Sequence, residues 1–186
     1  MTHHHETFVE LFSAGMIDKR LDALAQQISR EFDFVTETVP LVVIGVLKGS
    51  FIFLADLVRK LTIPVEIEFV RVTSYGQSQT SSGKPEILFA TLNDFTGRDV
   101  LVVEDIVDTG YTVDTLLKYL RSLGANRIKV CTLLDKPAKR QMQVPVDYIG
   151  FEVAPQFTFG YGLDVAECYR EKNGIYALEN LPEPQS

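Results

Sequence analysis

The sequence predicts an α/β protein with a doubly wound, mainly parallel sheet of five central strands flanked by helices. Short, continuously apolar runs alternate with segments of helical periodicity, and carboxylates and a glycine turn follow the clearest of these runs. Parallel strands need helical crossovers that bury both faces of the sheet, and strands covered in this way read as unbroken apolar runs. The alternation therefore favours this fold class.

The first half of the chain predicts one βαβ unit. Apolar residues at three- and four-residue steps indicate an N-terminal amphipathic helix: Ile17, Leu21, Leu24, Ile28 and Phe32. Residues 40–47 form an apolar run typical of a strand covered on both faces. After a break at residues 48–50, residues 51–61 have helical character, and residues 65–72 predict the next strand.

The second half contains a clearer unit. Residues 100–107 predict a strand, and Gly124 stands where a helix C-terminal cap belongs. The helix between them is indicated by an apolar stripe: Val113, Leu116, Leu117, Leu120 and Leu123. Residues 128–134 and 146–153 complete the five strands.

A length of 186 residues fits one domain. Residues 73–85 contain four serines and predict a long loop, either a cover for a substrate or a passive surface excursion. The polar, proline-containing tail after residue 178 is expected to fray.

The net charge of −7 argues against a broad surface for nucleic acid or anionic lipid. The chain shows no apolar run of membrane-helix length and no signal-peptide plan at its start, so we expect a cytoplasmic protein. Cys131 and Cys168 lack CxxC spacing and predict no disulfide framework. The consecutive His3, His4 and His5 have no partner cluster, so no native metal site is expected there.

The acidic pair Glu104 and Asp105 ends the strand at residues 100–107, where ligands of α/β sheets bind. Two like charges about 4 Å apart cost about 4 kcal/mol at an effective dielectric near 20. The pair therefore needs a cation, hydroxyl donors or solvent, and a sugar diol or a metal would serve.

The next five residues, 108–112, form a loop that enters a helix. Gly110 permits close backbone approach, the first amides of the helix are unpaired, and Thr109 and Thr112 add hydroxyl donors. Together these groups suit a phosphate monoester. In the alternative interpretation, Asp108 or Thr109 caps the helix and the acidic pair is solvated.

Two glycine motifs are excluded as nucleotide sites. The GKP at Gly83 lacks the other residues of a Walker loop, and the GYGLDV at Gly160 lacks the third glycine of a dinucleotide fingerprint. Neither supports a nucleoside triphosphate or NAD as ligand.

At VVEDIVDTGYT, residues 102–112, the sequence resembles the phosphoribosyl-diphosphate signature of type I phosphoribosyltransferases. Further segments resemble, in order, the hypoxanthine (hypoxanthine-guanine) phosphoribosyltransferases: residues 47–57, 73–76, 133–137 and 153–170. The resemblance implies a type I phosphoribosyltransferase fold in a single domain, residues 1–186. Its small hood would be formed by the N-terminal helix and residues 153–180.

The activity implied by the resemblance belongs to purine salvage. The enzyme would transfer 5-phosphoribosyl from phosphoribosyl diphosphate (PRPP) to N9 of hypoxanthine or guanine, giving IMP or GMP and diphosphate. By resemblance, Glu104 and Asp105 accept hydrogen bonds from the ribose hydroxyls, directly or through magnesium. The 5′-phosphate is held by Asp108, Thr109, Gly110, Tyr111 and Thr112. Asp108 is also the candidate general base, and Tyr111 stands where some relatives carry lysine.

The resemblance assigns the other substrate groups to different segments. Lys48, Gly49 and Arg170 would bind diphosphate, with a cis peptide bond between residues 47 and 48. The purine would be contacted by Lys136, Phe157, Thr158 and Asp164. Ser74 and Tyr75 match a mobile loop that closes over the site.

Mg²⁺ is the implied cofactor, with Glu104, Asp105 and Asp164 as its protein contacts. The implied partners are PRPP and a 6-oxopurine base, without nucleic acid or membrane, in a homodimer or homotetramer. Two alternatives remain: a phosphoribosyltransferase for another base, such as xanthine or a pyrimidine, and a regulatory protein that senses PRPP or nucleotides without turnover.

Overall fold

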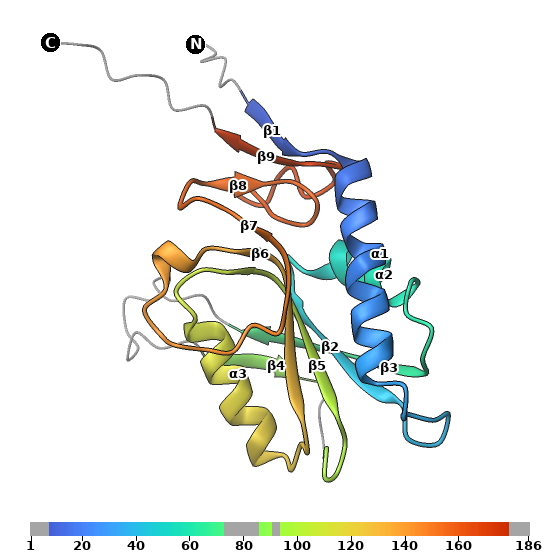
Figure 1. The fold of residues 1–186 in the computed structure, drawn as a ribbon. Coiled ribbons are helices and arrows are strands. Elements are labelled where there is room, and N and C mark those ends of the chain that lie inside the picture. Colours follow the sequence, from blue (N-terminus) through green and yellow to red (C-terminus); the bar gives the residue numbers. More distant parts are fainter. Residues whose placement is uncertain (1–7, 73–85, 91–93, 179–186) are drawn as a thin grey trace, which may run out of the picture.

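The computed structural model describes residues 8–72, 86–90 and 94–178, which form two sheets flanked by helices (Figure 1). The strand order of the larger sheet is β4-β3-β2-β5-β6-β7. Its strands are β2 (Leu41–Leu47), β3 (Val65–Val72), β4 (Ile87–Ala90), β5 (Val100–Val107), β6 (Ile128–Asp135) and β7 (Tyr148–Glu152). The whole predicted loop of residues 73–85, with Ser74 and Tyr75, lies outside the described residues, as do the three histidines and the tail after residue 178.

Five strands of this sheet run parallel, as the sequence predicts: β3, β2, β5, β6 and β7. The sixth, β4, pairs antiparallel with β3 at the sheet edge and was not predicted. It has only four residues, too few to show an alternating pattern. The bounds of β3 and β5 agree with prediction, whereas β7 is shorter than residues 146–153.

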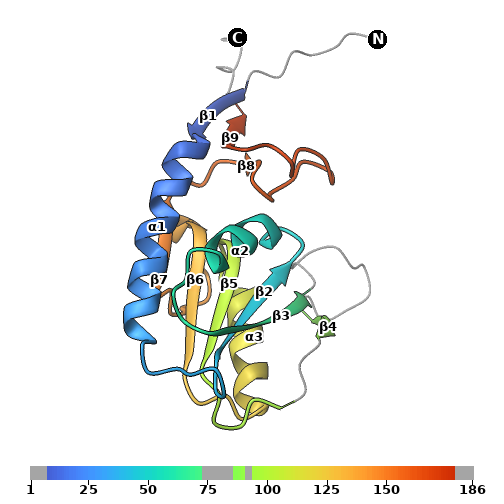
Figure 2. The same ribbon diagram turned by 90° about the vertical axis from the view of Figure 1, so that its right-hand side faces the viewer.

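Helices α1 (Ala14–Glu31) and α2 (Phe51–Val58) cover one face of the sheet, and α3 (Tyr111–Ser122) covers the other (Figures 1 and 2). Successive strand side chains point to opposite faces. Accordingly Val43 of β2 packs in the core under α1, whereas Val42 and Ile44 pack in the core under α3. This explains why the strands read as continuous apolar runs.

The helix ends follow their local sequence. The hydroxyl of Ser13 accepts a hydrogen bond from the Met16 amide and caps α1. Helix α3 ends at Ser122, and Gly124 adopts a φ of 83°. This confirms the predicted C-terminal cap of that helix. No helix in the described ranges is long and apolar enough to span a bilayer.

The smaller sheet joins the two ends of the described chain in the order β1-β9-β8, with β1 (Phe8–Phe12), β8 (Thr158–Phe159) and β9 (Ile175–Leu178). We call this sheet and residues 160–174 the hood. A Cβ built on Gly162 of the hood would lie 2.1 Å from the carbonyl oxygen of Gly49, just after β2. The hood therefore faces the carboxyl ends of the parallel strands, while α1 itself packs against α2 and β7.

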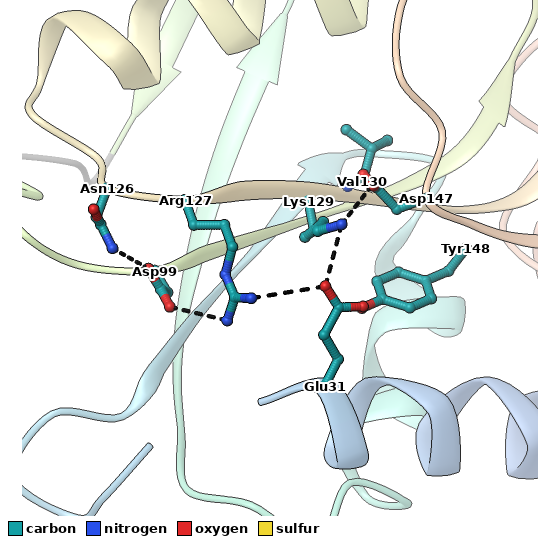
Figure 3. Close-up of polar contacts among 8 residues, drawn as sticks. All are labelled: Glu31, Asp99, Asn126, Arg127, Lys129, Val130, Asp147 and Tyr148. Carbon is teal, nitrogen blue, oxygen red and sulfur yellow. Dashed lines mark hydrogen bonds and ion pairs between the residues drawn. The ribbon is translucent and has the colours of Figure 1, made fainter. Parts of the chain in front are cut away.

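A charged cluster ties the end of α1 to the opposite, amino end of the sheet (Figure 3). Glu31 accepts a hydrogen bond from the Tyr148 hydroxyl and pairs with Lys129 at 3.1 Å and Arg127 at 3.8 Å. Lys129 also pairs with Asp147 at 2.9 Å. The cluster joins the last residue of α1 to the starts of β6 and β7.

Replacing Glu31 with glutamine is expected to cost about 1 kcal/mol of unfolding free energy at pH 7, because about a third of the side chain is exposed. The Tyr148 hydrogen bond and the charges of Lys129 and Arg127 lower the pKa of Glu31 below its ordinary 4.5, against the effect of burial. This stabilisation is present above pH 4.5 and is lost as the pH falls through the lower folded-state pKa.

Urea unfolding of both proteins between pH 7 and pH 3 measures the effect. The difference between wild type and Glu31→Gln should shrink as the pH falls, and an undiminished difference at pH 3 would contradict the assignment. Glu37→Gln, in the exposed loop after α1, provides the matched charge-removal control.

Candidate active site

The acidic pair at the end of β5 is withdrawn from solvent. Glu104 is buried, and its Oε2 has no hydrogen-bond partner among the described residues. Burial, and then the neighbouring Asp105, raise the pKa of Glu104 well above its ordinary value. Burial also raises the pKa of Asp105 to about 6, although its carboxylate accepts the Ile106 amide at 2.9 Å. Two buried carboxyl groups whose pKa values are raised in this way are suited to a cation or to further hydrogen-bond donors.

The predicted phosphate loop lies between β5 and α3. Gly110 has a φ of 89°, and a Cβ there would lie 2.5 Å from the Met142 carbonyl oxygen. The Thr109 carbonyl accepts the amides of Gln141 and Met142 at 3.0 and 2.9 Å. Residues 141–142 therefore hold the loop in place, and only a residue without a side chain fits at position 110.

Asp108 does not cap α3. Gly110 occupies the N-cap position without a side-chain cap bond, and the Asp108 carboxylate instead accepts the amide of Thr109. Of the two readings that the sequence left open, the structure therefore does not support capping. The N-cap residue Gly110 provides no side-chain cap for α3, and the first amides of a helix suit an anion.

The loop after β2 lies directly against the acidic pair. The Leu47–Lys48 peptide bond is cis, as the resemblance implies. A Cβ built on Gly49 would lie 1.5 Å from Oδ2 of Asp105, so the backbone of Gly49 touches that carboxylate. Asp105 is thus held between its own strand and the loop that enters α2.

The hood adds charged residues above this loop. Arg170 pairs with Asp164 at 2.8 Å and donates to the Gly162 carbonyl oxygen at 2.8 Å. Its charge also acts to lower the pKa of Asp105. Lys48 pairs at 2.7 Å with Glu167, which the sequence had not indicated as a site residue.

Lys136 connects the end of β6 to the hood. It is buried, and its ammonium donates to the Gln156 carbonyl oxygen at 2.6 Å and to the Thr158 hydroxyl at 3.4 Å. Burial lowers the pKa of Lys136, and the nearby Asp108 partly opposes this shift. Thr158 is buried, whereas Phe157 is 51% exposed. Phe157 stands in sequence between the two residues that the Lys136 ammonium contacts, and an exposed aromatic and an ammonium in one segment suit a planar ligand with an acceptor edge.

The structure thus brings together the predicted residues from β2, β5, β6 and the hood. Sequence reasoning missed Arg140, which pairs with Asp135 and whose Cδ would lie 3.3 Å from a Cβ on Gly110. It also missed Glu167 and the close fit of Gly162 onto Gly49. For the contact of Arg140, the sequence offered one indication, which is that this arginine follows closely on the family-like segment 133–137. The other two contacts had no indication in the sequence.

The acidic pair supplies carboxylate oxygens, which are the donors that a hard metal ion prefers. Across the described ranges, no group of three or more histidine, cysteine, aspartate or glutamate side chains is arranged to hold one. Among the described residues, the buried Oε2 of Glu104 has no hydrogen-bond partner and the pKa of Asp105 is raised, which are properties of oxygen donors suited to a cation. Such a pair fits a hard ion that takes its other ligands from a substrate.

A model of the phosphoribosyl transferase domain matches residues 10–166. Hypoxanthine phosphoribosyltransferase of Haemophilus influenzae is 40% identical over 170 residues, covering 91% of this chain and 93% of that protein. Hypoxanthine-guanine phosphoribosyltransferase of Bacillus subtilis is 41% identical over 175 residues, covering 94% and 95%.

Two solved structures extend the likeness to the fold. The hypoxanthine-guanine phosphoribosyltransferase of Bacillus anthracis has a TM-score of 0.83 at 38% identity and covers 91% of this chain and 98% of its own. The hypoxanthine phosphoribosyl transferase of Trypanosoma cruzi has a TM-score of 0.86 at 36% identity, covering 96% and 94%. With sequence, fold and domain model in agreement over most of its length, this chain belongs to the phosphoribosyl transferase domain family.

Proposed function

We propose that this chain is a hypoxanthine phosphoribosyltransferase of purine salvage. It transfers 5-phosphoribosyl from PRPP to N9 of hypoxanthine or guanine, and the products are IMP or GMP and diphosphate. The observation that carries this proposal is the contact between Gly49 and the Asp105 carboxylate. The contact supports the assignment of residues 48–49 to diphosphate and of the acidic pair to ribose, because one substrate could then reach both groups.

The substrate would lie along the carboxyl end of the sheet. Its 5′-phosphate accepts from the amides and hydroxyls of residues 109–112, and its ribose hydroxyls donate to Glu104 and Asp105. Its diphosphate meets Lys48, Gly49 and Arg170. As the bond from the anomeric carbon to diphosphate breaks, positive charge develops on the ribose, and the two nearby carboxylates stabilise it electrostatically.

The base attacks the anomeric carbon from the face opposite the departing diphosphate and loses a proton as it does so. The new bond joins N9 to the anomeric carbon, and Asp108 accepts a proton at N7 as general base. The Lys136 ammonium donates to O6, which selects 6-oxopurines, because the amino group of adenine would place a donor against a donor. Phe157 stacks on the base, and Thr158 and Asp164 lie at its edge.

Mg²⁺ is the proposed cofactor. Glu104, Asp105 and Asp164 would hold it together with oxygens of PRPP, and it would neutralise the charge that collects on the departing diphosphate. Oε2 of Glu104 is buried and has no hydrogen-bond partner in the part of the chain that the structure describes, which supports this assignment.

The remaining proposals concern the whole protein. We propose one phosphoribosyltransferase domain over residues 1–186, with a hood that covers the site, in a cytoplasmic protein. We also propose a homodimer or homotetramer. For the Trypanosoma cruzi relative, the C-terminal region has a role in oligomeric state and enzymatic activity. Sedimentation at working concentration measures the assembly.

One assay tests the proposed function. Purified protein is mixed with Mg²⁺, PRPP and each base in turn, and nucleotide formation is followed optically. Turnover with hypoxanthine or guanine is expected. Turnover with uracil instead would overturn the base assignment, and binding of PRPP without any turnover would favour a regulatory protein.

A further inference from the structure

Glu167 sits between the two cations that the proposed function assigns to diphosphate. Its Oε2 lies 2.7 Å from Nζ of Lys48 and 3.4 Å from Nη2 of Arg170. The Lys48 and Glu167 side chains are 48% and 64% exposed, so this contact is open to solvent. A carboxylate oxygen and a diphosphate oxygen accept the same N–H groups, so the two anions compete for one place.

The backbone around Glu167 holds the carboxylate in that position. Val165 and Cys168 exchange two hydrogen bonds of 3.0 Å, and Asp164 accepts the Glu167 amide at 2.7 Å. Glu167 and Ala166 have φ values of 69° and 48°, a region that residues other than glycine adopt rarely. Such conformations persist where surrounding contacts impose them, and they gather at ligand sites. The turn therefore presents Glu167 in a defined direction.

The two cations depend on Glu167 to different degrees. Arg170 keeps Asp164 and the Gly162 carbonyl oxygen as partners when Glu167 moves away. For Lys48, Glu167 is the sole ion-pair partner within the described residues. Glu167 thus acts mainly through Lys48.

We propose that Glu167 is an internal counter-anion, which occupies the diphosphate end of the site in the free protein and is displaced when diphosphate binds. This inference rests on the proposed function. Substrate must break the contact between Lys48 and Glu167 before it gains its own contact with Lys48. When diphosphate leaves, the ion pair between Glu167 and the Lys48 ammonium forms again. Glu167 therefore weakens diphosphate affinity and is a positioning residue, because it acts through Lys48.

Isothermal titration with inorganic diphosphate and Mg²⁺ tests this on the full chain. Exposed ion pairs are weak, so Glu167→Gln should tighten diphosphate binding by roughly two- to tenfold and lower the KM for PRPP similarly. Glu171→Gln, an exposed carboxylate in the same segment, is the matched control and should bind like wild type. Unchanged or weaker binding by Glu167→Gln, or equal tightening by Glu171→Gln, would overturn the proposal.

A double-mutant cycle shows whether the effect passes through Lys48. In a Lys48→Met background, Glu167→Gln should tighten diphosphate binding much less than in the wild type. An undiminished effect would mean a general change of charge and would also overturn the proposal.

The same measurements distinguish an error in the proposed function from an error in the role of Glu167. A wild type that forms no nucleotide with any base would remove that function, and this inference with it. A wild type that turns over normally, beside a Glu167→Gln variant without tighter binding, overturns the inference alone.

Discussion

Replacing Asp108 with alanine is expected to lower kcat by roughly 10²- to 10⁴-fold, the usual loss when a general base is removed. Asp108 lies in the loop between β5 and α3 and near the ammonium of Lys136, which would contact the same base. The protein should remain folded, because Gly110 rather than Asp108 occupies the N-cap of α3. Steady-state kinetics with PRPP and hypoxanthine measures the effect.

Asp108→Asn separates proton transfer from loop structure. The asparagine oxygen still accepts the Thr109 amide, as the carboxylate does, but cannot take a proton at neutral pH. We therefore expect kcat to fall about as far as in the alanine variant, with little change in KM for PRPP. Asp114→Asn is the control, because Asp114 lies in the same helix and pairs at 2.7 Å with the exposed Lys118. Near-normal turnover by Asp108→Asn would show that Asp108 only shapes the loop.

Gly49→Ala is expected to reduce kcat/KM for PRPP by at least about 100-fold, because a misplaced reacting group costs that much. The added methyl carbon would lie 1.5 Å from Oδ2 of Asp105, far inside van der Waals contact. Either the Asp105 carboxylate or the loop at Lys48 must move, and both contact the substrate in the proposed function. Kinetics together with diphosphate titration measures the loss.

Two further variants test whether the overlap between the new methyl group and Asp105 causes the effect of Gly49→Ala. Gly15→Ala in α1 should leave activity unchanged and stabilise the fold by up to about 1 kcal/mol, because nothing lies within 4 Å of its Cβ. Asp105→Ala should restore thermal stability to Gly49→Ala, because it removes the group that the methyl meets. If the double variant is no more stable than Gly49→Ala, the overlap is not the cause of the defect.

The local part of the site was predictable because its determinants are neighbours in sequence. An apolar strand, two carboxylates, a glycine turn and an amphipathic helix follow one another between residues 100 and 123. Their order alone places Glu104, Asp105 and the predicted phosphate loop at the carboxyl end of a strand. The bounds of β5 and the stop at Gly124 agree with this reading.

Other features had no signal of their own. The strand β4 has four residues, and its pairing with β3 depends on an available sheet edge. The role of Phe157 in base stacking and the metal contacts of Asp164 stay predictions, because they depend on a bound ligand.

By itself the sequence determined the alternation of buried strands and helices, and which loops carry carboxylates and glycines. Both are properties of neighbouring residues, since apolar periodicity and turn chemistry act over a few positions. Only the tertiary structure decided that Gly49 touches Asp105 and that Glu167 reaches Lys48. Each contact joins two segments that are far apart in the sequence. Which residues meet depends on how the hood and the loop after β2 pack over the sheet, and the spacing of residues along the chain does not specify that packing.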